Sequence, residues 1–210
     1  MTNFVMVAGA GSGKTTSLVK ALDHLAKTRG PGLKRRGQRV ACITYTEVAE
    51  KEIWADVGNA PFVHVSTVHS FLWTIIKPFQ EDIRAWVTDQ IAEKVKKLRE
   101  KNDAPRRQKR TRERAQQDIV KLEAQLAVLP KKARFTYGSG SDYQKCVLGH
   151  DDIIKMVPML LCERALLRTL VAEQFPFIFI DESQDTNPDV VNALKKVAVD
   201  ATGHFWIFCS

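Results

Sequence analysis

The sequence predicts an α/β protein: an open parallel sheet with helices on both faces, interrupted by an inserted, mainly helical subdomain. Short apolar runs rich in β-branched and aromatic residues alternate with helical patterns at both ends of the chain. Their consecutive apolar positions suit parallel strands that helices cover on both faces. The pattern changes only in the middle, where residues 79–131 show helical periodicity and no strand.

The expected elements alternate as strand and helix, which predicts right-handed crossovers within one sheet. The expected strands are 3–8, 39–44, 62–66, 175–181 and 204–209. The expected helices are 14–28, 46–56, 67–76, 151–173 and 187–199. Apolar residues at helical spacing on both sides of "NDAP" (102–105) predict an antiparallel helical hairpin. The glycine-rich segment 133–149 is expected to form a loop or a short β-hairpin.

We therefore expect the α/β domain at 1–76 and 148–210, with a basic helical subdomain inserted at 77–147. Eleven Lys or Arg and three acidic residues between 94 and 114 give this segment a net charge of +8, equal to the formal charge of the whole chain. A charge run of this kind is commonly a solvated face. Because one segment holds the whole excess of positive charge, contact with nucleic-acid phosphates is about as well supported as a solvated face. The expected phosphate contacts are Arg106, Arg107, Lys109 and Arg110.

The remaining composition predicts a soluble cytoplasmic protein. The four cysteines form no C-x-x-C pair and have no zinc-like spacing with histidine, which favours reduced thiols. No stretch approaches the roughly 20 apolar residues of a membrane span, so no membrane partner is expected.

The first predicted strand leads into "AGAGSGKTT" (8–16), which has the A-x-x-x-x-G-K-T form of a P-loop. Its glycines let successive N–H groups point at phosphate oxygens, and the following helix adds its positive N-terminus. The lysine can reach the β- and γ-phosphates, and the threonine after it can bind Mg²⁺. The predicted cradle consists of Ala8, Gly9, Ala10, Gly11, Ser12, Gly13, Lys14, Thr15 and Thr16. A glycine-rich turn without a ligand fits this strand–loop–helix context less well.

A second motif, "FIFIDESQD" (177–185), ends a buried strand on a cluster of carboxylates. Ligands of open α/β sheets bind at the carboxyl ends of the strands, so this cluster and the P-loop can share one site. Asp181 is expected to hold the Mg²⁺ of a nucleotide, and Glu182 to deprotonate the attacking water. A helix N-cap would account for Ser183 and Thr186 but not for an Asp-Glu pair on a strand end. The two motifs together predict a nucleotide hydrolase.

Several motifs, in the same order, resemble those of the UvrD/Rep-type superfamily 1 DNA helicases. The P-loop looks like motif I, "ITYTEVAEKEI" (43–53) like motif Ia and "VSTVHSFLW" (65–73) like motif Ib. The segment "LGHDDIIKMVPMLL" (148–161) resembles the family's helix before motif II. Finally, "FIFIDESQDTNP" (177–188) looks like motif II with the family's distinctive DExxQD form. The resemblance implies a RecA-like P-loop NTPase domain.

The resemblance also implies roles for individual residues. Gln184 would sense the γ-phosphate and couple it to DNA, beside Lys14 and Glu182 in catalysis. Six residues would line a track for single-stranded DNA: Thr44, Tyr45, Thr46, Thr67, His69 and Phe71. Trp73 is a further candidate for this track. For Phe71 and Trp73 a place in the core is at least an equal alternative, because they follow a strand on an apolar helix face. His150, Asp151 and Asp152 are interpreted as a helix start and not as a metal site.

ATP and Mg²⁺ are the cofactors that the resemblance implies, and single-stranded DNA and duplex junctions are the implied partner. The resemblance stops before the family's Gly-Asp-x-x-Gln motif III, and no adenine-reading glutamine precedes the first strand. We therefore expect the N-terminal half of a helicase, which would need a second RecA-like domain to unwind DNA.

Two alternatives come from other classes of protein. One is a DNA-binding module without catalysis or independent helicase activity, and the other is a small P-loop kinase. The intact Lys14, Thr15, Asp181 and Glu182 argue against the first. The DESQD sequence argues against the second.

Overall fold

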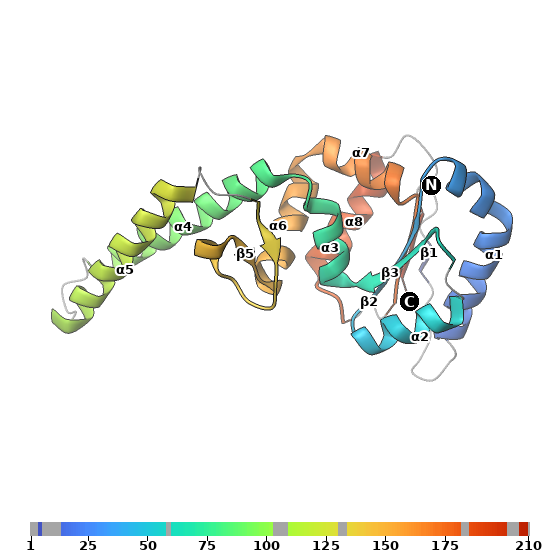
Figure 1. Cartoon of the computed structure of the whole chain (residues 1–210), viewed down its shortest axis with the longest axis horizontal. Helices are drawn as coiled ribbons and strands as arrows, with labels where there is room; N and C mark the ends of the chain where they lie inside the picture. Colours follow the sequence, from blue (N-terminus) through green and yellow to red (C-terminus); the bar gives the residue numbers. More distant parts are fainter. Residues whose placement is uncertain are drawn as a thin grey trace. The chain divides into compact units, whose positions relative to one another are not determined.

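The computed structural model of the 210-residue chain describes residues 4–5, 14–57, 60–102, 109–129, 134–181, 185–200 and 206–209. The chain divides into two compact units, Met1–Ile75 with Val157–Ser210 and Ile76–Met156. The first unit holds the main sheet and the second a helical hairpin (Figure 1). The predicted α/β class is confirmed, whereas the predicted domain boundaries stay a prediction.

Five parallel strands form the sheet of the first unit, in the order β1-β7-β6-β2-β3. The strands are β1 Phe4–Val5, β2 Val40–Thr44, β3 Val63–Thr67, β6 Phe177–Ile180 and β7 Trp206–Cys209. Every predicted strand is thus present. All five residues of β2 are buried, which explains why its sequence is apolar without alternation. In the register, Cys42 of β2 lies between Val65 of β3 and Phe179 of β6.

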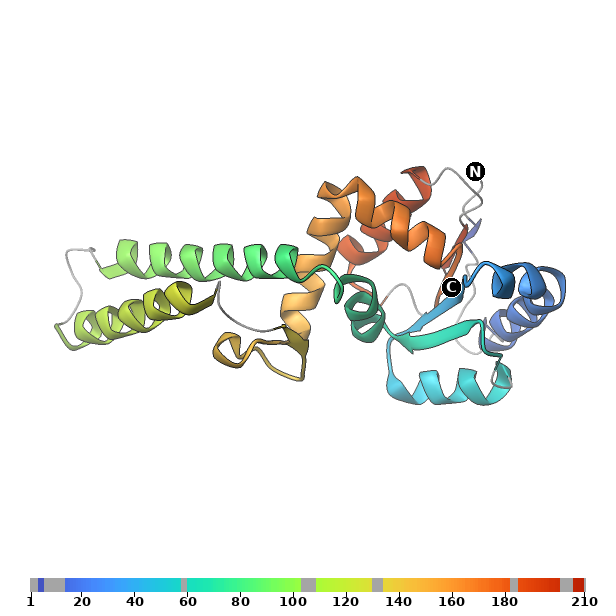
Figure 2. The same cartoon turned by 45° about the horizontal axis from the view of Figure 1, so that its top comes forward.

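Helices cover both faces of this sheet (Figure 2). On one face, α1 (Lys14–Arg35) and α2 (Glu47–Val57) pack against the alternate strand residues. The shared core cluster consists of Leu18, Leu22, Leu33, Val40, Cys42, Ile53, Val63, Val65 and Phe179. On the other face, the Phe71 ring of α3 (Val68–Ile76) meets Phe175 edge-to-face at 5.2 Å and lies near His64 of β3. The sequence between the strands therefore folds back over both faces, as parallel pairing requires.

The first helix is longer than predicted, because it continues through Pro31 to Arg35 instead of ending at 28. Leu33, past the Gly-Pro-Gly step, is buried in the core cluster, and this burial favours the extra turns. Gly37 then adopts a left-handed φ of 65°, and the N–H of Gln38 donates to the carbonyl of Leu33 at 3.0 Å. This Schellman motif ends the helix with its last carbonyls satisfied.

The predicted single helix 151–173 is instead two helices, α6 His150–Glu163 and α7 Ala165–Gln174. Arg164 is extended between them. The buried guanidinium of Arg168 donates to the carbonyls of Leu161 at 2.6 Å and Cys162 at 2.9 Å, which satisfies the open end of α6. The break is therefore stabilised by a side-chain contact that reaches back across it. The last helix, α8, spans Pro188–Asp200 and contacts α7.

The second unit contains the predicted antiparallel hairpin, formed by α4 (Gln80–Asn102) and α5 (Lys109–Val128). The buried stripe of α4 consists of Ile83, Trp86, Val87, Ile91 and Val95. Ala115 and Ile119 are buried on α5. Apart from Trp86, the stripe of α4 follows the helical spacing that predicted the hairpin. None of the described helices is long and apolar enough to cross a membrane.

The segment after the hairpin does not form a β-hairpin, which was one of the two expectations for it. Its two short strands, β4 (Thr136–Tyr137) and β5 (Val147–Leu148), pair parallel. The chain between them turns through a short 3-10 helix, η2 (Tyr143–Lys145), and Cys146 in the left-handed region at φ 56°. This turn brings the second strand back in the same direction as the first.

One buried carboxylate organises this segment. Asp152, at the third position of α6, accepts hydrogen bonds from the Ser141 hydroxyl, from the Tyr143 hydroxyl at 2.7 Å and from the backbone N–H of Gly149 at 2.9 Å. The last bond is one half of a capping box, because it satisfies the N–H of the residue before the helix. A Cβ at Gly149 would lie 2.8 Å from the backbone nitrogen of Ser141, so the approach requires glycine. The predicted helix start at His150 is confirmed.

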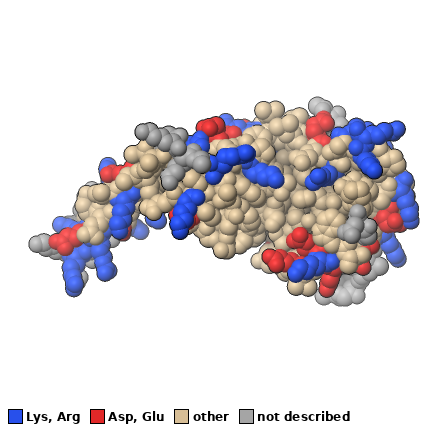
Figure 3. Space-filling view, viewed as in Figure 1, with Lys and Arg blue, Asp and Glu red and all other residues tan. Residues whose placement is uncertain are grey.

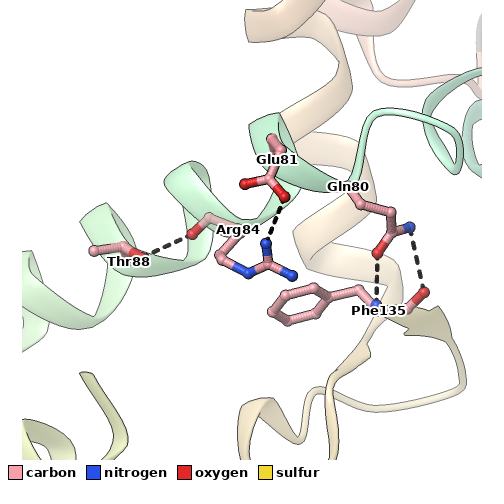
Figure 4. A network of polar contacts seen from close by, with 5 residues as sticks. All are labelled: Gln80, Glu81, Arg84, Thr88 and Phe135. Atoms are coloured by element: carbon pink, nitrogen blue, oxygen red, sulfur yellow. Dashed lines mark hydrogen bonds and ion pairs between the residues drawn. The ribbon is translucent and has the colours of Figure 1, made fainter. Parts of the chain in front are cut away.

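Gln80 joins the start of α4 to the chain that leaves the hairpin (Figure 4). Its Oε1 accepts from the backbone N–H of the buried Phe135 at 2.7 Å. Its Nε2 donates to the carbonyl of Lys77 at 2.7 Å and to that of Phe135 at 3.5 Å. Gln80 and Phe135, which this one amide joins, are 55 residues apart in sequence.

We expect Gln80→Ala to destabilise the unfolding transition of the second unit by about 1–3 kcal/mol, because it leaves the buried N–H of Phe135 without its acceptor. Chemical denaturation followed by circular dichroism measures the loss, and hydrogen exchange of the 134–137 peptide locates it. Gln90→Ala, at an exposed position of the same helix, is the matched control. Equal stability and equal exchange in the two variants would contradict this account.

Candidate nucleotide site and nucleic-acid interface

The strands that precede the two predicted nucleotide motifs are β1 and β6, and both belong to the parallel sheet. Because all its strand pairs are parallel, the carboxyl ends of β1, β2, β3 and β6 lie along the same edge. The chain leaves β1 towards α1, which begins at Lys14, and leaves β6 at Asp181. Strand β7 lies between β1 and β6. Ligands of open α/β sheets bind at this edge, outside the carboxyl ends of the strands.

Asp181 is the predicted metal ligand, and the structure buries it at the end of β6. Its exposed fraction is only 6%, and its backbone N–H extends the sheet by donating to the carbonyl of Ile43 at 2.8 Å. Burial, and secondly the charge of Asp181, raise the pKa of the Cys42 thiol to about 12. Cys42 therefore remains a neutral thiol at physiological pH. A buried carboxylate is a suitable oxygen ligand for a divalent cation.

Much of the predicted site falls outside the described residues. This holds for the P-loop residues Ala8–Gly13 and for Glu182, Ser183 and Gln184. Lys14, Thr15 and Thr16 form the first turn of α1, but their side chains are not described. The convergence of Lys14 and Asp181 on one nucleotide therefore stays a prediction.

The segment after Asp181 shows which residue caps the last described helix, α8. Asp185 is exposed and Thr186 is buried, and α8 begins at Pro188. The Oδ1 atom of Asn187 accepts from the N–H of Asp189 at 2.8 Å, so the cap of α8 is Asn187 and not Thr186, which the alternative interpretation considered. The dipeptide Asn-Pro was the missed signal, because proline is favoured at the first helical position and asparagine directly before it.

At the end of β2, the three predicted DNA contacts differ in exposure. Thr44 is buried, and its hydroxyl donates to the carbonyl of Thr46 at 2.9 Å. The Thr46 hydroxyl accepts from the N–H of Ala49 at 3.2 Å and so caps α2. Tyr45 between them is 52% exposed. Tyr45 is thus the side chain of this turn that offers a ring to solvent, while the two threonines shape the turn.

At the end of β3, the Thr67 hydroxyl accepts from the N–H of Ser70 at 3.4 Å and donates to its hydroxyl at 3.1 Å, which caps α3. His69 is half-buried. Phe71 is fully buried against the Phe175 ring and is a core residue rather than a DNA contact, because no face of its ring is open to a base. The alternative interpretation of Phe71 is therefore the one that the structure supports.

Glu50 of α2 links these two turns, and the sequence did not single it out. Burial raises the pKa of its carboxyl group, while a hydrogen bond to the backbone of Thr67 opposes the increase. The contact joins the helix after β2 to the end of β3. In the sequence, Glu50 is one of several glutamates in α2, and no pattern distinguishes it from the others.

Of the basic residues predicted to contact phosphates, Arg106 and Arg107 lie outside the described residues. Lys109 begins α5, and its side chain is not described. Arg110 is exposed on α5. Other Lys and Arg side chains gather along the hairpin (Figure 3). The hairpin therefore presents positive charge to solvent where the sequence predicted it.

Comparison with known proteins identifies the family of the chain. The family model described as "UvrD/REP helicase N-terminal domain" matches residues 1–208. The Gabija protein GajB of Bacillus cereus is 25% identical over 88% of this chain and 36% of its own length. The ATP-dependent DNA helicase Rep of Salmonella typhimurium is 28% identical over 91% of this chain and 31% of its own length. The chain thus spans about a third of the length of these relatives. It belongs to the UvrD/Rep helicase family, and its residues 1–208 correspond to that family's N-terminal domain.

Proposed function

We propose that the chain is the ATP-binding N-terminal half of an ATP-dependent DNA helicase. In the complete protein, hydrolysis of Mg-ATP would drive movement along single-stranded DNA and unwinding of a duplex. The observation that carries this proposal is the buried Asp181, which directly follows β6 at the edge where the parallel strands of the sheet end. The relative Rep, an ATP-dependent DNA helicase, supports it.

The predicted site residues have the chemistry that a magnesium-bound nucleoside triphosphate requires. A helix N-terminus attracts phosphate, and Lys14 at that terminus adds a full positive charge. The Thr15 hydroxyl and the Asp181 carboxylate are oxygen ligands of the kind that Mg²⁺ requires. When bound, Mg²⁺ neutralises phosphate charge. Glu182, next to Asp181 in sequence, would accept a proton from the attacking water, and Gln184 would orient that water or sense the γ-phosphate.

The same edge can connect the nucleotide to DNA. Tyr45 and the turn after β3 follow strands that pair, directly or through β2, with β6. Exposed aromatic rings bind single strands by stacking on bases without reading their sequence. The contact of Glu50 with Thr67 would make the two turns respond together to a change at the nucleotide.

We expect Lys14→Ala to weaken binding of Mg-ATP by roughly 10- to 150-fold, because a charge-assisted hydrogen bond to phosphate contributes about 1.5–3 kcal/mol. Titration of the 210-residue chain with a fluorescent ATP analogue measures this. Lys20→Ala, on an exposed position of the same helix, is the control and should bind as the unmodified chain does. Unchanged affinity in Lys14→Ala would contradict the phosphate role.

Glu182→Gln should leave binding of Mg-ATP intact and lower its hydrolysis by about 100-fold or more, because the amide cannot accept the proton. Single-turnover hydrolysis of radiolabelled ATP is the measurement. Glu173→Gln, at an exposed position of α7, serves as the control. If both variants hydrolysed ATP at the rate of the unmodified chain, Glu182 would not be the base. If no form of the chain bound any Mg-NTP, the alternative of a purely DNA-binding module would be favoured.

Replacing Arg106, Arg107, Lys109 and Arg110 together by Gln should weaken binding to single-stranded DNA and make its salt dependence shallower. Each lost phosphate contact removes about 0.7 from the slope of log K against log salt, so the full loss is up to about 2.8. Fluorescence anisotropy at several salt concentrations gives the slope. The charge-matched control replaces Lys20, Lys27, Arg29 and Lys34, all exposed on α1. An equal slope in both variants would mean that the hairpin tip is only a solvated face and does not bind phosphate.

A further inference from the structure

A cleft in the second unit has no role in the proposed hydrolysis. It lies between the helical hairpin and residues 141–144, and its volume is about 670 Å³. Clefts of this size commonly hold a small ligand or one part of a larger one. On the hairpin side, α4 supplies Gln90, Lys94 and Lys97, and α5 supplies Leu122 and Gln125. The facing wall belongs to a segment that is distant from α4 in sequence.

The two walls differ in charge. The α4 wall carries Lys94 and Lys97 beside Glu93, and the facing wall carries Asp142, whose Oδ2 is 3.4 Å from the ammonium nitrogen of Lys145. Lys94 and Lys97 are exposed on α4, and the only ion pair described for either joins Lys97 to Glu93 at 3.5 Å, with both side chains half exposed or more. Such a surface pair is weak, so an anion can compete for the ammonium group. On the facing wall, Asp142 accepts from the N–H of Lys145 at 3.2 Å, and this bond lowers the pKa of Asp142 and keeps it negative. A ligand that is anionic at one end and a hydrogen-bond donor at the other would fit this polarity.

Between these walls, the lining suits a planar polar ring. Leu122 offers apolar surface, and the half-buried Tyr143 is an aromatic residue on which a base can stack. Gln90, Gln125 and Gln144 each carry a donor and an acceptor, as the edges of nucleobases do. A nucleotide combines an anionic phosphate, a flat ring and hydrogen-bond donors on the ring edge, so it matches all three features of the cleft.

The facing wall is held in place before any ligand binds. The Tyr143 hydroxyl donates to Asp152 Oδ1 at 2.7 Å, and the Ser141 hydroxyl donates to Oδ2 of the same carboxylate. Asp152 is itself buried at the start of α6. Fixing a side chain in advance reduces the entropy cost of binding. Asp152 would therefore act as a positioning residue for the ring of Tyr143.

We propose that this cleft holds a nucleotide of a single-stranded nucleic acid, with its phosphates on Lys94 and Lys97 and its base against Tyr143. The proposal rests on the proposed function in taking nucleic acid as the ligand. It adds a grip separate from the arginines of the hairpin tip. A single strand is required, because the bases of a duplex are stacked on each other and offer no free face to Tyr143.

The test uses the 210-residue chain and a fluorescent oligothymidylate. Lys94→Gln/Lys97→Gln should weaken binding by at least about fivefold at low salt and reduce the salt slope by about 1.4, as expected for two phosphate contacts on a single strand. Lys77→Gln/Lys155→Gln removes the same charge from exposed positions of the same unit outside the cleft. This control should keep the slope of the unmodified chain. Equal effects in the two double variants would overturn the proposal.

Photo-cross-linking of an oligonucleotide that contains 4-thiothymidine supplies an independent readout. The cross-link should map to the peptide that contains Tyr143 and should be lost in Lys94→Gln/Lys97→Gln. A cross-link confined to other peptides, or displacement from this peptide by free ATP, would overturn the proposal, the latter by making the cleft a site for a free nucleotide. Binding of duplex of equal length with the same dependence on Lys94 and Lys97 would overturn it as well.

Binding of Mg-ATP, measured on the same samples, separates this proposal from the proposed function. The cleft variants should bind Mg-ATP as the unmodified chain does. If the unmodified chain binds both Mg-ATP and DNA but the cleft variants match their control, only the cleft proposal fails. If the unmodified chain binds no oligonucleotide, the cleft proposal fails together with the DNA part of the proposed function.

Discussion

Parallel pairing of the strands is the constraint on which the rest of the first unit depends. A parallel pair cannot be closed by a tight turn, so each connection must cross the sheet, and the helices that make these crossings cover both faces. The strands must then be apolar on both sides, as the five buried residues of β2 are. The carboxyl ends consequently meet at one edge. Thr44 and Asp181, far apart in sequence, become neighbours there through the bond between the Asp181 N–H and the Ile43 carbonyl.

This constraint explains why the class of fold and the positions of the strands could be predicted from the sequence, whereas the ends of the helices could not. A short run of mostly apolar residues is a local signal, and it marked all five strands. The end of α1 depends on Leu33, which is buried among residues of β2, β3 and α2. The division between α6 and α7 accompanies the reach of the Arg168 guanidinium back to the carbonyls of α6. Such tertiary contacts leave no local pattern, and local breakers such as Pro31 are misleading without them.

At the candidate site, the types of residue could be predicted from the sequence, but the orientation of their side chains could not. The sequence predicted which strands precede the candidate site residues, but not which of the following side chains face solvent. At the end of β2, Thr44 turns inward and Tyr45 outward. On α3, polar side chains and buried apolar side chains lie within three residues of each other. Phe71 could therefore be assigned to the core only from its ring contacts. The glycine-rich loop and Glu182 come from motifs alone, since they lie outside the described residues.

In the second unit, hydrogen-bonded polar side chains have the organising role that strand pairing has in the first. The hairpin is held by an apolar stripe on α4, but its base and the segment after it are joined by the Gln80 amide and the Asp152 carboxylate. Each of these side chains bonds to groups outside its own helix. Asp152 is buried and Gln80 is half-buried, so leaving their bonds unmade would be costly. Full satisfaction therefore selects one arrangement of the segment 134–149 over its many alternatives. A glycine-rich, polar stretch that would otherwise sample many conformations thus forms a fixed wall opposite α4, and a binding cleft requires two fixed walls.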